Sequence, residues 1–488
     1  MKTTNMKKLM AYTALLLAGG FSGCSKFLEK APDNRTELNT PEKVSQLLGT
    51  AYPQANYMDF AESMSDNVAD KGIGAPDLTN TGSFRFEDIS DNNQDSPEYF
   101  WNAAYAAIAA ANQALQTCNS APDPQNYVSQ KGEALVCRAF SHFMLVIFFA
   151  RSYDPETATT DPGIPYVTEP ENVVIKPYER KTVDYVYQMI QKDLEEGLPL
   201  LDDNRYTVPK YHFTRMAAHA FAARFFLFKQ DYAKVVEHAN LALGSGNPVN
   251  WLRPWNTTYL SLTYQQMFET YAQASTAANL LLVESSSTWA RYYYVVRYGM
   301  TTAKRDEILG ENVTGGEWAF RYQLYTAGEN NLMIPKINEY FVQSSINANI
   351  GMPYVMVPML TAEEVLLNRA EANAWLGNSS STLSDLNTYA STRIRNYSSA
   401  SNAITINKIR NFYGIANNTI GLVRTVLDFK RAEYVQEGMR WLDILRLKIP
   451  VVHFSSDGEM YQLSGDDNRK MLQLPQSTSL SGLEPNPR

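Results

Sequence analysis

Two carboxylates near the C-terminus have a spacing that could serve acid–base chemistry. Glu433 and Glu437 stand four residues apart within the stretch 428–447, DFKRAEYVQEGMRWLDILRL, which its apolar spacing predicts to be one helix. A retaining glycosidase needs two carboxyl groups about 5 Å apart that flank a sugar from two sides. Two glutamates stacked on one helix beside arginines do not provide that arrangement. We therefore interpret the pair as part of a structural ion-pair network and expect no catalytic residues.

The same stretch contains further signs of a structural role. Glu437 with Arg440 and Asp443 with Arg446 are spaced three residues apart, a spacing that lets opposite charges meet on a helix surface. Gly438 lies between them and costs about 1 kcal/mol relative to alanine inside a helix. We expect this glycine to allow a close backbone contact.

Metal and nucleophile motifs are missing from the sequence. The chain has 5 histidines, and none of them forms a paired zinc motif or faces a glutamate in metalloprotease register. No nucleophile elbow and no phosphate-binding glycine loop is present. We expect no metal, no cofactor and no enzymatic activity.

Aromatic residues are the unusual part of the composition, at 12% of the chain with 30 Tyr and 7 Trp. Tyr and Trp rings stack on the apolar faces of sugars, while carboxylates, amides and arginines bind the hydroxyl groups. Three tryptophans lie on helical stripes and are assigned to the core: Trp101, Trp375 and Trp441. The candidate ligand residues lie in irregular stretches: Trp289, Tyr292, Trp318, Tyr322, Asp66, Asp70 and Arg85.

Cys24 is the centre of a second chemical motif. Lysines, an apolar run over 9–17 and small residues precede it, the pattern of a signal peptide. Ser22 and Gly23 directly before the cysteine turn this into a lipoprotein signal, so we expect residues 1–23 to be removed and Cys24 to be acylated. Several acyl chains on one cysteine give stable membrane anchoring. Residues 24–40 are polar and read as a lipidated tether.

A helical scaffold is predicted to position these residues. Apolar residues recur at helical spacing in much of 41–243 and 359–488. The expected helices span 41–55, 101–115, 132–149, 182–198, 216–243 with a turn at 229–231, and 361–389 with a turn at 376–378. Thr361 and Glu364 form a capping box at the start of the last of these. Small alanines between paired helices are typical of tetratricopeptide-like hairpins. We expect a mainly α fold, an α-superhelical scaffold forming one domain over 41–488.

Between residues 244 and 358 the helical pattern lapses. This segment holds many of the aromatic residues, and we expect a loop-rich insertion with short strands at 279–284 and 290–296. Loops on a rigid scaffold often carry function. The two other cysteines, Cys118 and Cys137, fall on two neighbouring helices at different heights, so we expect free, buried thiols.

The net charge argues against nucleic acid as a partner, and the hydropathy argues against a membrane-spanning helix after the leader. The net charge is −8, and nucleic-acid binding needs a basic surface. After the leader, the best apolar run, Phe143–Ala150, is far shorter than the roughly 20 residues of a membrane span. We expect no nucleic acid and a buried helix at this run.

Motifs along nearly the whole chain after Cys24 resemble the SusD/RagB family of outer-membrane nutrient-binding lipoproteins of Bacteroidetes. Their order and spacing carry the resemblance, with Lys430 and Tyr434 as departures where the family favours Arg and Leu. The matching residues are Phe27-Leu28-Glu29, Pro32, Trp101, Tyr105, Ile108, Asn112, Gly132-Glu133-Ala134, Arg138-Ala139-Phe140, Gly163-Ile164-Pro165, Arg369-Ala370-Glu371-Ala372, Glu433, Glu437-Gly438, Arg440-Trp441, Asp443, Arg446, Leu474-Pro475-Gln476 and Asn486-Pro487.

The resemblance implies a cell-surface lipoprotein, anchored in the outer membrane, that forms a lid on a SusC-like TonB-dependent transporter. Such proteins capture oligosaccharides and do no chemistry. Two alternatives for ligand and activity stay open: a peptide-binding member of the family, and a lipoprotein glycoside hydrolase. A third alternative is a purely structural subunit of the transporter. Because ligand residues vary within the family, the resemblance transfers none of them to this chain.

Overall fold

A computed structural model describes residues 38–171, 176–328, 330–346 and 348–488. Within it, Thr40–Arg488 forms one compact unit. The expected signal peptide, Cys24 and most of the expected tether lie outside the described residues.

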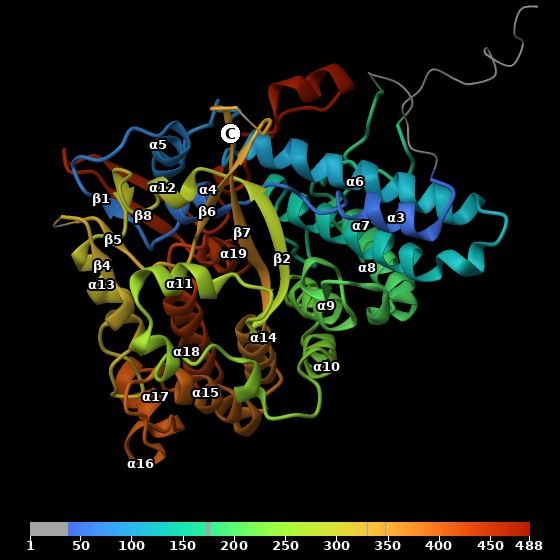
Figure 1. The fold of residues 1–488 in the computed structure, drawn as a ribbon. Helices are drawn as coiled ribbons and strands as arrows, with labels where there is room; N and C mark the ends of the chain where they lie inside the picture. The colour runs from blue at the N-terminus through green and yellow to red at the C-terminus, as the bar shows by residue number, and fades with distance from the viewer. Residues whose placement is uncertain (1–37, 172–175, 329, 347) are drawn as a thin grey trace, which may run out of the picture. The chain divides into compact units, whose positions relative to one another are not determined.

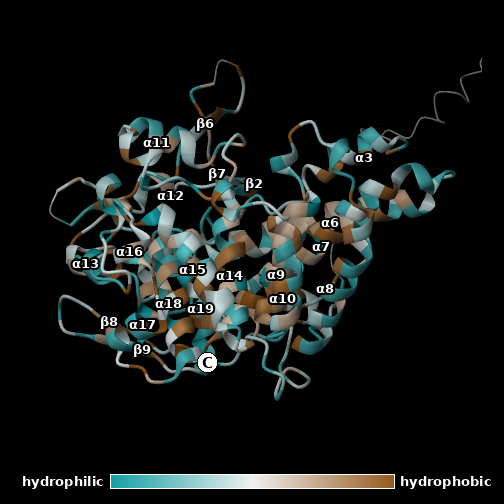
Figure 2. Ribbon diagram, turned by 90° about the horizontal axis from the view of Figure 1, so that it is seen from below, coloured by the Kyte–Doolittle hydropathy of each residue, from teal (hydrophilic) through white to brown (hydrophobic). Residues whose placement is uncertain are grey.

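Antiparallel helices form the N-terminal half of the scaffold (Figure 1). Neighbours in the chain pack as pairs, α6 on α7, α7 on α8, and α9 on α10, and their apolar residues gather where they meet (Figure 2). The helices are α6 Pro97–Ser120, α7 Val128–Phe149, α8 Val183–Gly197, α9 Arg215–Phe228 and α10 Tyr232–Leu243. The predicted mainly α fold is confirmed.

Local sequence explains where these helices begin. Ser96, Thr182, Thr214 and Asp231 each accept a hydrogen bond from a backbone N–H of the first turn, which satisfies a donor that the helix itself leaves free. Five small alanines of α9 are fully buried, so its axis can approach its neighbours closely.

The C-terminal half of the scaffold continues the packing, with α14 against α10, α15 and α18. Its elements are α14 Ala362–Trp375, α15 Ser379–Arg393, α16 Ser399–Asn402, α17 Ile406–Tyr413, α18 Asn418–Glu433, α19 Met439–Arg446, β8 Val451–Phe454 and β9 Met460–Leu463. The single helix predicted over 428–447 is therefore wrong, because α18 ends at Glu433 and α19 begins at Met439.

The insertion contains a three-stranded antiparallel sheet in the order β2-β7-β6. In Figure 1 the sheet stands beside α9 and α14, which both contact β7. Val283 pairs with Val357, and Phe341 pairs with Pro353. The strands are β2 Asn279–Ser286, β6 Glu339–Gln343 and β7 Gly351–Thr361, and a smaller ribbon joins β4 Tyr325–Thr326 to β5 Leu332–Met333.

Three short helices complete the insertion: α11 Tyr264–Tyr271, α12 Trp289–Tyr292 and α13 Thr302–Leu309. The predicted strand at 279–284 is confirmed, but the strand predicted at 290–296 is wrong. Asp95 accepts hydrogen bonds from the Ser287 hydroxyl at 2.6 Å and the Thr288 N–H at 2.8 Å, which holds the chain in the turn that starts α12.

The N-terminal elements of the compact unit are short. They are α3 Pro41–Leu48, α4 Met58–Met64, β1 Ala69–Asp70 and α5 Leu78–Arg85, and β1 pairs with β3 Tyr298–Gly299. The first helix ends seven residues before its predicted end at 55. Short 3-10 helices connect the elements: η1 Pro124–Tyr127, η2 Leu198–Leu200, η3 Asp203–Arg205, η4 Pro209–Tyr211, η5 Pro248–Trp251, η6 Thr258–Ser261, η7 Ala319–Gln323, η8 Asn468–Lys470 and η9 Gln476–Ser481.

The helix α7 lies at the centre of the N-terminal core. Together with η1 it spans Pro124–Phe149, long and apolar enough to cross a membrane by length and composition, yet its most apolar window is wholly buried inside the fold. The buried helix expected at Phe143–Ala150 is confirmed. Cys118 and Cys137 are free and buried, as predicted.

Candidate functional site

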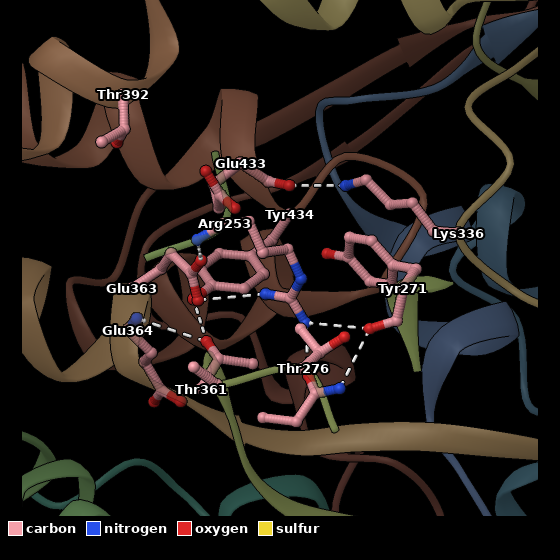
Figure 3. Close-up of polar contacts among 12 residues, drawn as sticks. Arg253, Tyr271, Thr276, Lys336, Thr361, Glu363, Glu364, Thr392, Glu433 and Tyr434 are labelled. Atoms are coloured by element: carbon pink, nitrogen blue, oxygen red, sulfur yellow. Dashed lines mark hydrogen bonds and ion pairs between the residues drawn. The ribbon is translucent and has the colours of Figure 1, made fainter. Parts of the chain in front are cut away.

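Glu433 and Glu437, the sequence candidates for acid–base chemistry, lie beside cations inside the protein. Figure 3 shows Lys336 bonded to the Glu433 backbone carbonyl. Arg393 Nε lies 2.8 Å from a Glu433 carboxylate oxygen, and Lys336 Nζ lies 2.6 Å from Glu437. Tyr271 donates a hydrogen bond of 2.9 Å to Glu437. The interpretation of this region as an ion-pair network is confirmed.

A second carboxylate, Glu363, extends the network. It lies 3.0 Å from Arg253 and 2.9 Å from Arg393, and all three side chains are fully buried. Burial opposes the charge of Glu433, but the Arg393 guanidinium outweighs it and lowers the pKa of the Glu433 carboxyl. The network therefore keeps the Glu433 carboxylate ionised for structural reasons.

The predicted pair of Glu437 with Arg440 is wrong, whereas the Asp443–Arg446 pair is confirmed at 2.5 Å. The chain leaves the helix before Glu437, with positive φ at Gln436 (71°) and Gly438 (76°). Glu62 accepts hydrogen bonds from the N–H groups of both residues, at 2.8 and 3.0 Å. The turn thus depends on a carboxylate from α4.

Trp289 and Trp318 are buried and are not platforms on which a ligand could stack. Trp289 is 3% exposed and Trp318 is 1% exposed. The indole N–H of Trp289 donates to the Gln436 carbonyl at 3.4 Å, and Trp318 packs against Phe320 and Phe429. Among the tryptophans assigned to the core, Trp101 and Trp441 are buried, while Trp375 is half-buried against Tyr232.

Tyr292 and Tyr322 are the exposed aromatic candidates, at 38% and 42%. Tyr322 donates a 2.7 Å hydrogen bond to Glu317, and the Arg395 guanidinium lies over its ring at 4.3 Å. An aromatic face with an acid and a base beside it could bind a polar ring from solvent.

Asp66, Asp70 and Arg85 have partners within the protein. Asp66 receives two hydrogen bonds of 2.8 Å from Arg440, and Asp70 receives bonds of 2.8 and 2.7 Å from Arg297. The arginines lower the pKa of both carboxyls in spite of burial. Arg85 is half-buried with its guanidinium 5.9 Å from the Tyr461 ring centre. These three residues hold the first irregular stretch in place.

A group of half-exposed aromatic rings in the insertion was not selected from the sequence. We call it the tyrosine cluster and define it as Tyr264, Phe268, Tyr294 and Tyr325. The Tyr264 ring centre lies 4.8 Å from Phe268 and 4.9 Å from Tyr325, both edge to face. Burial and the neighbouring Tyr294 and Tyr325 raise the pKa of Tyr264. Tyr294 and Tyr325 stood out in sequence as part of the aromatic insertion, but nothing local marked Tyr264 as their neighbour.

Polar groups border the tyrosine cluster. Lys71, one residue after β1, donates hydrogen bonds of 3.0 Å to the Tyr294 carbonyl and to the Asn331 side chain. Burial lowers the pKa of Lys71 to about 8. The cluster therefore combines apolar ring faces with an amine and an amide, which is the composition expected of a site for a polar, ring-shaped ligand.

Comparison with known proteins relates this architecture to a family. Residues 26–227 match a family model, SusD-like_3, described as starch-binding associating with outer membrane. Over this segment the chain is similar to the SusD-like family. The resemblance drawn from the sequence motifs is thereby confirmed.

Individual similar proteins cover most of the chain. "SusD-like protein P2" of Formosa agariphila is 24% identical over 419 residues, 77% of each chain. A SusD superfamily protein from Bacteroides thetaiotaomicron superposes with a TM-score of 0.70 at 18% identity, covering 92% of this chain and 100% of that one. A protein from Bacteroides vulgatus described as a putative sugar binding protein has a TM-score of 0.70 at 19% identity, covering 93% and 99%. These structures share the fold.

Proposed function

We propose that this SusD-like chain binds oligosaccharides at the cell surface without changing them and delivers them to a SusC-like TonB-dependent transporter. The tyrosine cluster carries the proposal. It is a group of half-exposed rings bordered by hydrogen-bonding groups, whereas the sequence candidates for acid–base catalysis are paired with buried cations.

The chemistry of the cluster suits a sugar. A pyranose has apolar C–H faces and a rim of hydroxyl groups. Rings at different angles can pack on the C–H faces, while Lys71 and Asn331 lie near the hydroxyl groups. The planes of Tyr264 and Tyr325 meet at 75°, so the cluster offers ring surfaces in two directions. The names of the matched family model and of the Bacteroides vulgatus structure, which refer to starch and sugar, support this ligand class.

Delivery requires that the binding body stay at the membrane. Cys24 after a lipoprotein signal motif supplies the expected anchor, and the association of the matched family model with the outer membrane supports it. We propose that the lipidated N-terminus holds the body over its transporter partner.

Isothermal titration with a panel of oligosaccharides tests the proposal. We expect Tyr264→Ala, Tyr294→Ala and Tyr325→Ala each to weaken binding of the recognised glycan by roughly tenfold, a change of about 1.4 kcal/mol. Tyr185→Ala is the matched control, because Tyr185 is 38% exposed but lies on α8. Unchanged affinity in all three cluster variants would refute this site.

The two alternatives predict different results in the same samples. A peptide-binding protein would bind members of a peptide panel and no glycan. A glycoside hydrolase would release new reducing ends from the glycan that it binds, and we expect none after prolonged incubation.

A further inference from the structure

Two histidines from adjacent antiparallel helices face each other in the N-terminal scaffold. His219 lies on α9 and His238 on α10, and their Nδ1 atoms are 3.0 Å apart. The ring centres are 5.2 Å apart with an angle of 32° between the planes. Neither residue belongs to the tyrosine cluster or to the buried ion-pair network.

The surroundings hold both rings in place. His238 is 8% exposed and stacks on Phe226 at 5.2 Å, while His219 is half-buried. The stacking on Phe226 fixes the orientation of the His238 ring, and the more open side of the pair lies at His219.

A contact between two Nδ1 atoms can hold only one proton. One ring donates and the other accepts, or both present lone pairs to each other, and the second arrangement is repulsive unless a cation lies between them. Bonds of 2.0 to 2.1 Å from a metal to two nitrogens at a tetrahedral angle would set the nitrogens roughly 3.4 Å apart. To reach that separation from 3.0 Å, the half-buried His219 moves away from His238, and the rings turn so that both lone pairs point at one ion.

We propose that His219 and His238 form a two-histidine site for a divalent late transition-metal ion such as Zn²⁺ or Cu²⁺. Imidazole nitrogen is a preferred ligand of these ions, and Mg²⁺ and Ca²⁺ prefer oxygen. No group of three or more His, Cys, Asp and Glu side chains suited to a metal occurs among the described residues, so water completes the coordination. The site clamps α9 to α10 when it is loaded.

Metal titration of the full mature chain tests the site, with the purification tag removed and prior metal stripped by chelator. We expect one Zn²⁺ per chain by calorimetry, no response to Mg²⁺, and a Cu²⁺ electron paramagnetic resonance spectrum with coupling to two nitrogens. Loading with Zn²⁺ should raise the melting temperature, because the ion binds the folded state.

Variants separate this pair from other histidines. At known metal sites, replacing a residue that only supports a metal ligand weakens metal binding by about 10- to 100-fold. His219→Asn, at the half-buried position, and His238→Asn each remove a ligand, so each should weaken Zn²⁺ binding by at least that lower factor. His212→Asn is the control and should bind as the wild type does, because His212 contacts Glu133 instead. Absence of stoichiometric Zn²⁺ binding, or full binding retained in His219→Asn with a native circular dichroism spectrum, would overturn the proposal.

Discussion

Arg393 is the residue on which the buried network depends most, because it bonds to Glu433 at 2.8 Å and to Glu363 at 2.9 Å with no exposure to solvent. Removing one partner of a buried ion pair costs about 3–5 kcal/mol, since a charge is left without compensation. We expect Arg393→Met to lower the free energy of unfolding by that amount in urea titrations. Arg291→Met is the control: its pair with Glu339 is 47% exposed on the arginine side, and exposed pairs contribute at most about 1 kcal/mol. Equal losses in the two variants would contradict the assignment.

His142 makes stability depend on pH in a defined range. Its ring is fully buried, with Nδ1 donating to the Arg138 carbonyl at 2.9 Å and Nε2 accepting from the Val167 N–H at 3.0 Å. A protonated ring would lose the second bond. Burial lowers its pKa to about 3 from the ordinary 6.5, so the folded state binds fewer protons than the unfolded state between these values. The stabilisation is complete above about pH 6.5 and is lost as pH falls toward 3.

The measurement is the free energy of unfolding from urea titrations between pH 7 and pH 4. In the wild type we expect His142 to lower the free energy of unfolding by roughly 1.4 kcal/mol for each pH unit below 6.5. The His142→Gln variant should show little of this pH-dependent decrease. An unchanged slope in His142→Gln would show that other groups cause it.

At the residue scale, sequence reasoning succeeded where partners are close in the chain and failed where they are distant. The Asp443–Arg446 pair follows from spacing alone. The partner of Asp66 is Arg440, 374 positions away, and no local pattern indicates it. Trp289 and Trp318 were selected because their surroundings are irregular in sequence, but irregular backbone can be as buried as helix, as their exposures of 3% and 1% show.

At the element scale, the break between α18 and α19 is the feature with the strictest backbone requirement. Gly438 has φ 76°, and a Cβ there would lie 3.1 Å from both the Ala61 Cβ and the Met58 Cα. The predicted close backbone contact is thus confirmed. The sequence alone could not show that Gly438 lies in a break between two helices, directly before α19, because the carboxylate that accepts the freed N–H groups, Glu62, comes from α4.

Gly438→Ala therefore combines backbone strain with a steric clash. Positive φ at a non-glycine residue costs about 1–3 kcal/mol, and the contact with Met58 backbone adds to this. Gly377→Ala is a matched control, since Gly377 has φ 79° and no atom within 4 Å of the added Cβ. We expect Gly438→Ala to lower the unfolding free energy by more than Gly377→Ala in parallel urea titrations. Equal losses of unfolding free energy in the two variants would mean that α4 moves away from the added Cβ at no energetic cost.

The helical hairpins were the part of the fold most readily predicted, because their signals are local. Alanine-rich pairing, caps such as Thr214 and Asp231, and the turn after Phe228 all lie within a few residues of each other. One half of the capping box predicted for α14 is confirmed, because Thr361 accepts a hydrogen bond from the Glu364 N–H. The other half is wrong, because the Glu364 carboxylate pairs with Arg224. The tyrosine cluster could not be predicted, since α11, the turn after α12 and β4 bring its rings together from positions 264 to 325.

At the scale of the whole molecule, the N-terminal and C-terminal parts of the compact unit pack against each other. The helix α4 packs against α19, and Asn67 accepts a hydrogen bond from Arg431 at 2.8 Å. The last residues lie on α7: the Leu472 N–H bonds to the Phe148 carbonyl at 2.8 Å, and the Asn486 side chain bonds to the Phe149 carbonyl at 2.9 Å. The segment that matches the family model, 26–227, therefore depends on partners beyond its end.

This interdependence predicts that residues 26–227 do not fold alone. The fragment leaves the buried Glu62 without its two backbone donors, ends within α9, and removes α10 and α14, which cover that helix. We expect it to be aggregated or to show helical circular dichroism without a cooperative melting transition, whereas residues 26–488, prepared in the same way, melt cooperatively. Supplying residues 228–488 as a second chain should restore protection of α4 and α7 from proteolysis, because the missing partners then return. A fragment that melts cooperatively by itself would show that the N-terminal hairpins are an independent folding unit. The contacts of α4 with the C-terminal segment would then orient α4 without being needed for folding.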